Sequence, residues 1–248
     1  MTSYNTRQTN RRGRAEMEPW DRRLTVLAGH YGSGKTELAV NLACAIGDTG
    51  RRCALCDLDV VNPYFRARER EAELSRHGVH LVASRLQGPE ADVPALPAEI
   101  YGVLQDRTQW GVVDLGGDGA GARALARFAG EIDPREAQVL FVLNANRPET
   151  RTVERAAASL DQIRRVLGLE FTGIVNNTHL CGETRAEDIL RGAALAQALS
   201  GRTGLPVCWH AARRDLAEKV TALGAVLPIR IYMRKPWEVE DYDGEGDH

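Results

Sequence analysis

The sequence predicts an α/β domain with a doubly wound, mainly parallel sheet and helices on both of its faces. Two observations indicate this class. Short apolar runs of strand length alternate with stretches of helical periodicity, and one glycine-rich turn joins such a run directly to an amphipathic helix. Strand–helix alternation places parallel strands side by side, so the crossover helices cover both faces. Hydrophobic residues form 43% of the 248-residue chain, which is enough for a sizeable core.

The expected strands are short apolar runs. They lie at residues 24–28, 53–56, 79–82, 111–114, 139–143, 171–175 and 206–209. The stretch 152–167 predicts a helix, and its apolar face consists of Val153, Ala156, Leu160, Ile163 and Leu167. Residues 86–97 contain three prolines and a glycine, which favours a loop.

The pattern suggests one domain at residues 21–235, preceded by a flexible arm at 1–20 and followed by an acidic tail at 236–248. The net charge of -2 gives no general argument for nucleic acid, and no apolar run reaches the roughly 20 residues of a membrane span. The arm carries arginines that could contact DNA, but the acidic tail opposes a uniform basic face. We expect a cytoplasmic protein that does not bind membranes.

The five cysteines are odd in number, which suits buried free thiols in a reducing compartment. Cys53 and Cys56 form a C-x-x-C pair inside an expected strand. Positions i and i+3 of a strand face opposite sides, so these thiols cannot easily share a metal ion. We expect both to be core residues.

The glycine-rich turn at residues 29–36 fits the phosphate-binding pattern G-x-x-x-x-G-K-[ST]. It consists of Gly29, His30, Tyr31, Gly32, Ser33, Gly34, Lys35 and Thr36, and Glu37 follows in the first helical turn. Glycines let the backbone wrap around phosphate oxygens, and the helix N-terminus adds partial positive charge. Lys35 would reach the β- and γ-phosphates, and Thr36 would bind Mg²⁺. We predict that this whole stretch, 29–37, contacts a nucleotide.

Two acidic segments narrow the chemistry. The strand 111–114 ends in Asp114, and an acid at a strand's carboxyl end can support the Mg²⁺ shell. Gly117, three residues later, could donate its backbone N–H to a γ-phosphate. After the second strand, Asp57 and Asp59 occupy alternate positions and would point the same way. Asp59 could orient the attacking water and is also a candidate metal ligand, and Asp57 could support the metal ion or the loop.

At these motifs the chain resembles the MinD/ParA group of P-loop ATPases, over roughly residues 23–222. The resemblance implies a doubly wound P-loop NTPase fold with about seven or eight strands, and ATP hydrolysis coupled to a nucleotide-dependent dimer. It implies that Asp59 activates water and that Asp114 is the switch II aspartate. It also implies that Asn177, or Asn176 beside it, contacts adenine.

One position departs from the family pattern. Where such loops usually carry a lysine that reaches the phosphates of the partner subunit, this chain has His30, followed by Tyr31 instead of glycine. A neutral imidazole does not replace a fixed ammonium. Another residue would have to supply the charge for a sandwich dimer. Candidates are Arg66, Arg68 and Arg70, although these also suit a solvated helix face.

The resemblance and the motifs together predict a Mg²⁺-dependent ATPase switch that acts through a homodimer or an unidentified protein partner. ATP is favoured over GTP because residues 176–180 lack the aspartate of N-K-x-D. Two alternatives stay open. A small-molecule kinase or ligase on this scaffold would use Asp59 or Asp118 near a second substrate. A cofactor- or metalloenzyme-maturation chaperone would bind ATP and turn it over slowly.

Overall fold

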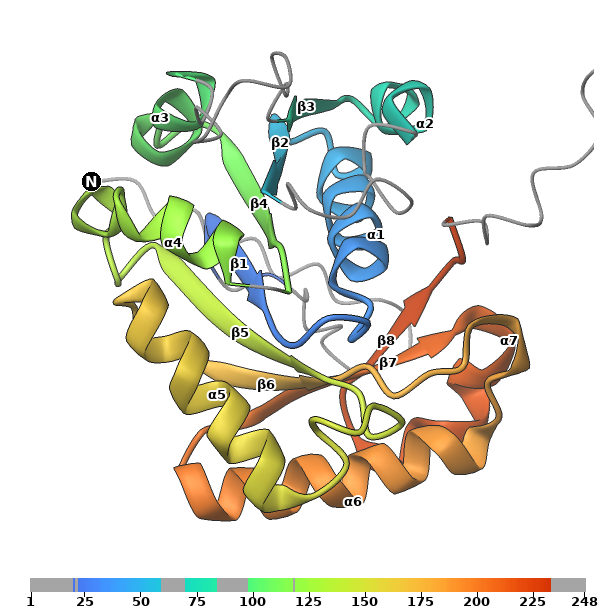
Figure 1. Ribbon diagram of the computed structural model, residues 1–248. Coiled ribbons are helices and arrows are strands. Elements are labelled where there is room, and N and C mark those ends of the chain that lie inside the picture. The colour runs from blue at the N-terminus through green and yellow to red at the C-terminus, as the bar shows by residue number, and fades with distance from the viewer. Residues whose placement is uncertain (1–19, 21, 59–69, 84–97, 118, 233–248) are drawn as a thin grey trace, which may run out of the picture.

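The computed structural model describes residues 20, 22–58, 70–83, 98–117 and 119–232 (Figure 1). Several predictions lie outside these residues: the loop at 86–97, the acidic tail, the arm up to residue 19, and the side chains of Asp59, Arg66, Arg68 and Asp118. Trp20, at the end of the expected arm, is buried in a core cluster with side chains of the helix Lys35–Asp48. The described domain therefore includes this residue.

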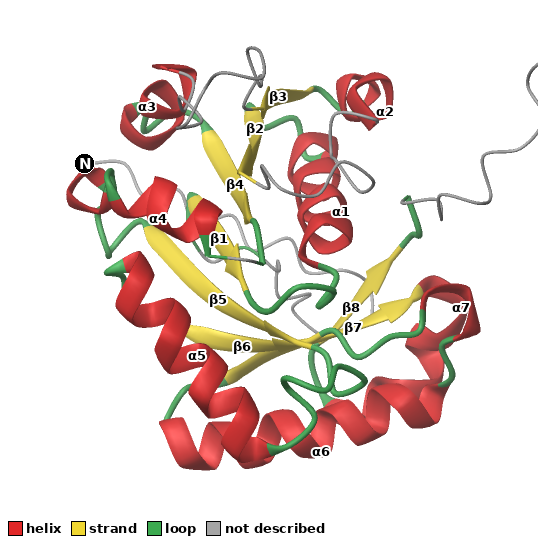
Figure 2. Cartoon of the chain, in the orientation of Figure 1, coloured by secondary structure: helices red, strands yellow, loops and turns green. Residues whose placement is uncertain are grey.

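The described strands form one sheet with the order β3-β2-β4-β1-β5-β6-β7-β8, and every neighbouring pair is parallel (Figure 2). The strands are β1 Leu24–Ala28, β2 Cys53–Leu58, β3 Val79–Ala83, β4 Trp110–Leu115, β5 Ala137–Leu143, β6 Gly173–Asn176, β7 Val207–Arg213 and β8 Val226–Ile229. The predicted doubly wound, parallel α/β fold is confirmed. The strand β8 has no counterpart among the runs expected from the sequence.

Helices cover both faces of the sheet (Figure 1). They are α1 Lys35–Asp48, α2 Glu71–Arg76, α3 Ala98–Gln105, α4 Ala120–Ala126, α5 Val153–Leu167, α6 Ala186–Thr203 and α7 Arg214–Ala217. Short 3-10 helices lie at Ala129–Glu131, Cys181–Glu183 and Glu218–Leu223. The core cluster on one face includes side chains from α1 and α2, and the cluster on the other face includes side chains from α3, α4, α5 and α6. The polypeptide thus winds in both directions from the centre of the sheet.

Alternation along the strands explains this two-sided core. In β1, Val26 and Ala28 join the cluster under α5, whereas Leu27 joins the cluster under α1. In β2, Cys53 and Cys56 divide between the two clusters in the same way. Burial raises the pKa of each of these thiols to about 12. The expectation of two inert core cysteines is confirmed.

The helix α5 begins one residue after the expected start. The Thr152 side chain accepts a hydrogen bond from the Arg155 backbone N–H, as an N-cap does. Gly168 ends the helix with φ 67°, the left-handed conformation that favours glycine. Ala156, Leu160 and Leu167 are buried, as the apolar periodicity predicts.

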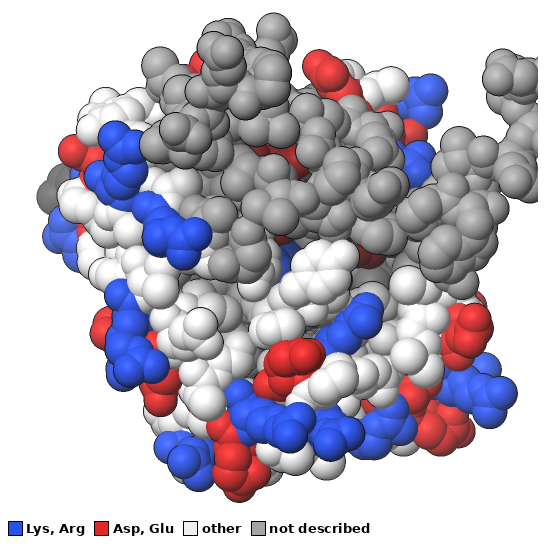
Figure 3. Space-filling view, viewed as in Figure 1, with Lys and Arg blue, Asp and Glu red and all other residues white. Residues whose placement is uncertain are grey.

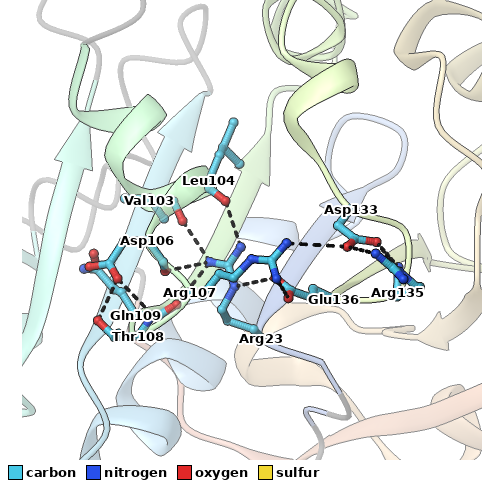
Figure 4. Close-up of polar contacts among 10 residues, drawn as sticks. All are labelled: Arg23, Val103, Leu104, Asp106, Arg107, Thr108, Gln109, Asp133, Arg135 and Glu136. Carbon is cyan, nitrogen blue, oxygen red and sulfur yellow. Dashed lines mark hydrogen bonds and ion pairs between the residues drawn. The ribbon is translucent and has the colours of Figure 1, made fainter.

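A cluster of polar contacts fastens the amino-terminal end of the sheet (Figure 4). Arg23, just before β1, donates from Nη1 to the carbonyl oxygens of Val103, Asp106 and Gln109, and from Nη2 to that of Leu104. These contacts connect β1 to the C-terminal end of α3, where carbonyl groups lack helical partners. Arg23 Nε also pairs with the Glu136 carboxylate at 3.3 Å.

On the face shown in Figure 3, basic and acidic side chains of the described residues are interspersed along α5 and α6. This face therefore gives no support to a uniform basic surface for nucleic acid. Among the described helices, none has the length and apolar character that crossing a membrane requires.

Candidate functional site

The turn at residues 29–36, called the phosphate loop below, follows β1 at the carboxyl end of the sheet and leads into α1. Gly32 has φ 73° and Gly34 has φ 80°, which side chains rarely tolerate. Gly34 is the N-cap residue of α1, so the free N–H groups of the first helical turn face the loop. This conformation is the one that wraps backbone amides around an anion.

Lys35 lies across the phosphate loop. Its Nζ donates a hydrogen bond to the His30 carbonyl oxygen at 3.1 Å, and its side chain is buried. Ser33 is also buried, and its hydroxyl oxygen has no hydrogen-bond partner among the described residues. A lysine ammonium and a hydroxyl at a loop rich in backbone N–H groups suit the oxygens of a nucleotide phosphate.

Two carboxylates lie on adjacent strands at this edge of the sheet. Asp57 of β2 is the register partner of Asp114 of β4, and Asp114 is in turn the register partner of Leu27 in β1, two residues before the phosphate loop. Both aspartates are buried. Register partners on parallel strands point to the same face. Buried paired carboxylates favour a bound cation, and Mg²⁺ typically takes one or two carboxylates together with phosphate oxygens.

The segment after β4 meets the phosphate loop. A Cβ atom added to Gly117 would lie 2.5 Å from the Tyr31 Cα and backbone nitrogen. Only glycine permits this approach, and the structure thus brings Gly117 against Tyr31 of the phosphate loop. Its hydrogen bond to a γ-phosphate stays a prediction. Asp59, the expected water-orienting residue, lies outside the described part of the chain.

Other side chains of the expected site make protein contacts. His30 Nδ1 lies 3.1 Å from the Tyr31 carbonyl oxygen and 3.8 Å from Glu149 Oε2, and the Tyr31 ring is exposed. The Glu37 carboxylate contacts the segment that follows β8, where its Oε1 accepts a hydrogen bond from the Tyr232 backbone N–H. Glu37 therefore fastens α1 to the segment after β8.

The two asparagines at the end of β6 hold neighbouring elements together. Asn176 donates from Nδ2 to the Ile189 carbonyl oxygen in α6, and the same nitrogen lies 3.1 Å from His210 Nδ1 in β7. Asn177 donates from Nδ2 to the carbonyl oxygens of Ser33 and Gly34, at 2.8 and 3.2 Å. Both amides are buried. The structure places Asn177 against the phosphate loop, and the adenine contact stays a prediction.

Sequence reasoning missed two residues that donate hydrogen bonds to the phosphate loop. Arg147 Nε and Asn144 Nδ2 both donate to the Gly32 carbonyl oxygen, at 2.8 and 3.3 Å. Both lie in residues 144–150, called the bracing loop below, directly after β5. The only sequence signal was a polar run that follows a buried strand. These partners lie more than a hundred residues away from Gly32, so no local spacing indicates them.

His179, which follows β6, also packs on the phosphate loop. A Cβ at Gly34 would lie 2.5 Å from its Nε2, and its Nδ1 accepts the Cys181 backbone N–H at 3.3 Å. Burial, with a smaller contribution from the Arg147 charge, lowers the pKa of His179 to about 4. The imidazole is thus neutral at pH 7. Among the described residues, no group of three or more His, Cys, Asp and Glu side chains could hold a metal ion.

Comparison with known families matches residues 24–191 to the CobQ/CobB/MinD/ParA nucleotide binding domain. A comparison with curated proteins finds no significant match. Among solved structures, the chain is similar to the cell division protein FtsY from Thermotoga maritima, with 18% identity, a TM-score of 0.48, and coverage of 74% of this chain and 59% of that one. It is also similar to the signal recognition particle 54 kDa protein from Aeropyrum pernix in complex with GDP, with 24% identity, a TM-score of 0.45, and coverage of 75% and 40%. The chain spans less than two thirds of either protein.

Proposed function

Because the chain belongs to the CobQ/CobB/MinD/ParA nucleotide-binding domain family of P-loop NTPases, we propose that it is a Mg²⁺-dependent ATPase that acts as a molecular switch. One observation carries this proposal most directly. The left-handed glycines, the buried Lys35 and the paired buried carboxylates lie together at the carboxyl end of the central strands. This is the edge at which open α/β sheets bind ligands.

The residues at the site suit phosphoryl transfer to water. Lys35 and the amides at the start of α1 would neutralise charge on the phosphates. Thr36, supported by Asp114 and Asp57, would hold Mg²⁺, which offsets the charge that develops on the phosphate oxygens when bound. Asp59 would orient the attacking water. Catalysis would then come from positioning and electrostatic stabilisation rather than from a covalent intermediate.

The choice of ATP rests on the sequence after β6. The segment 176–180 reads Asn-Asn-Thr-His-Leu and lacks the acid that would accept hydrogen bonds from the N1–H and N2–H groups of guanine. The proposal of a switch, through a nucleotide-dependent dimer or a protein partner, rests on the resemblance to the MinD/ParA group at the three motifs. We propose that hydrolysis changes which surfaces of the chain associate.

The Lys35→Ala variant tests the site. We expect nucleotide turnover to fall by about 10²–10³ or more, because one preorganised charge contact to the phosphates is lost. Binding of Mg²⁺–ATP and release of phosphate are measured on the full chain, and Lys219→Ala is the matched control because it removes an exposed lysine.

Wild-type turnover in Lys35→Ala would contradict the proposal that nucleotide is hydrolysed at this site. Product analysis separates the switch from a kinase or ligase, since a switch yields only ADP and phosphate. Light scattering with ATP and with ADP tests the dimer. A mass that doubles only with ATP supports the switch, and an unchanged mass contradicts its dimeric form.

A further inference from the structure

The guanidinium of Arg147 lies directly over the phosphate loop. Its Nε donates to the Gly32 carbonyl oxygen at 2.8 Å. A Cβ added to Gly32 would lie 2.7 Å from Arg147 Cζ and 2.9 Å from Nη2. Arg147 therefore fills the space that a side chain at Gly32 would need. Gly32 is required here for this close approach as well as for its φ of 73°.

No described carboxylate lies within ion-pair distance of the Arg147 guanidinium. Among the described residues it forms no ion pair, whereas nearby Arg191 is paired with Asp188 at 2.7 Å. The Arg147 side chain is half-buried, and its positive charge helps to lower the pKa of His179. Nε is occupied by Gly32, but the two terminal nitrogens keep donors for a further partner. A half-buried guanidinium without a carboxylate favours an anionic ligand.

The bracing loop holds Arg147 in place before any ligand binds. The Arg147 backbone N–H donates to the Asn144 carbonyl oxygen, and the Thr150 N–H donates to the Arg147 carbonyl oxygen. The buried Thr150 hydroxyl also donates to the Asn144 carbonyl oxygen at 2.7 Å. Asn146 donates from Nδ2 to the His179 carbonyl oxygen at 3.2 Å, which joins the loop to the segment after β6. Such preorganisation lowers the entropic cost of a contact made to a ligand.

We propose that Arg147 contacts the terminal phosphate of a nucleoside triphosphate bound at the phosphate loop, within the same chain. This inference rests on the proposed function and assigns to that site a residue outside its sequence motif. A guanidinium presents paired N–H donors that match the geometry of phosphate oxygens. An arginine at this position would distinguish a triphosphate from a diphosphate, because only the triphosphate carries the extra anionic group.

The Arg147→Gln variant tests this assignment on the full chain with Mg²⁺. We expect binding of a non-hydrolysable ATP analogue, measured by calorimetry, to weaken by about 10- to 100-fold, as for a lost charge-assisted hydrogen bond. ADP binding should change by less than about threefold. Arg147→Lys should recover part of the lost affinity, since it keeps the charge but not the paired donors.

Arg155→Gln is the matched control. Arg155 donates to the Pro148 carbonyl oxygen of the same bracing loop at 2.7 Å, and this variant removes the same charge without touching the phosphate loop. It should bind both nucleotides as the wild type does. Equal weakening of ADP and the analogue in Arg147→Gln, or equal effects in the two variants, would reduce Arg147 to a structural brace and overturn the proposal.

The failure of this assignment can be told apart from failure of the proposed function. If the wild type binds nucleotide, Lys35→Ala does not, and Arg147→Gln behaves as the wild type, only the role of Arg147 is wrong. If the wild type binds no nucleotide at the phosphate loop, both proposals are wrong. Thermal melting of each variant confirms that any loss of affinity occurs in a folded chain.

Discussion

Gly34 meets two separate constraints at the start of α1. Its φ of 80° is left-handed, and a Cβ there would lie 2.5 Å from both Asn177 Nδ2 and His179 Nε2. Gly50, just beyond the other end of the same helix, also has φ 80°, but a Cβ there would meet nothing within 4 Å. A comparison of substitutions at these two glycines therefore distinguishes the cost of the left-handed backbone from the cost of steric contact at the phosphate loop.

We predict that Gly34→Ala destabilises the protein more than Gly50→Ala does, measured by urea unfolding. Each substitution costs about 1–2 kcal/mol for the left-handed conformation. Gly34→Ala must also displace two buried side chains, so nucleotide affinity should fall by at least about tenfold while Gly50→Ala binds normally. Equal stability and equal binding in the two variants would contradict the packing described for Asn177 and His179.

At the scale of helices and strands, Arg23 connects two elements through its hydrogen bonds. The site lies at the carboxyl end of the sheet, whereas Arg23 fastens α3 to β1 at the opposite end (Figure 4). Its side chain is only 12% exposed, so its hydrogen bonds to carbonyl groups are shielded from water. Arg135 in the same view is 87% exposed and pairs with Asp133.

We predict that Arg23→Ala lowers the free energy of unfolding by about 2–4 kcal/mol, because several carbonyl groups lose a charged donor. Nucleotide affinity should not change, since the phosphate loop lies at the other end of β1. Arg135→Ala serves as the control and should leave stability nearly unchanged, as expected for an exposed ion pair. A loss of nucleotide binding in Arg23→Ala at a temperature where it is folded would show that the two ends are coupled.

The strand β8 is the element that the sequence pattern did not predict. Val226–Ile229 has only four residues, includes Pro228, and lies at the edge of the sheet. Proline is confined to edge strands and weakens the sequence pattern of a strand. Pairing with β7 defines this element, and that pairing is a tertiary contact.

At the scale of the whole molecule, the burial of His179 makes the stability of the protein depend on pH. Its pKa is lowered to about 4 from an ordinary value near 6.5. Between these values the unfolded chain binds a proton that the folded chain does not. Stability is therefore retained above about pH 6.5 and decreases as the pH falls toward about 4.

We predict that His179→Gln loses less stability than the wild type when urea unfolding is repeated at pH 7 and at pH 4.5. The wild-type penalty from this group approaches about 3 kcal/mol at the low end of the range. His80→Gln, which makes the same replacement at an exposed histidine of β3, is measured alongside as the matched control. An unchanged pH dependence in His179→Gln would show that this imidazole is accessible to protons in the folded state.

Local sequence determined the fold class, most of the strands and the phosphate loop of this protein. Those features depend on periodicity and on residues close together in the chain, such as the glycines and Lys35 in the turn that starts α1. The register of Asp57 with Asp114, the edge strand β8, and the contacts of Arg147, Asn177 and His179 with the phosphate loop were decided only by tertiary structure. The reason is physical: hydrogen bonds between distant segments depend on how the strands are ordered, and single-sequence patterns do not encode that order.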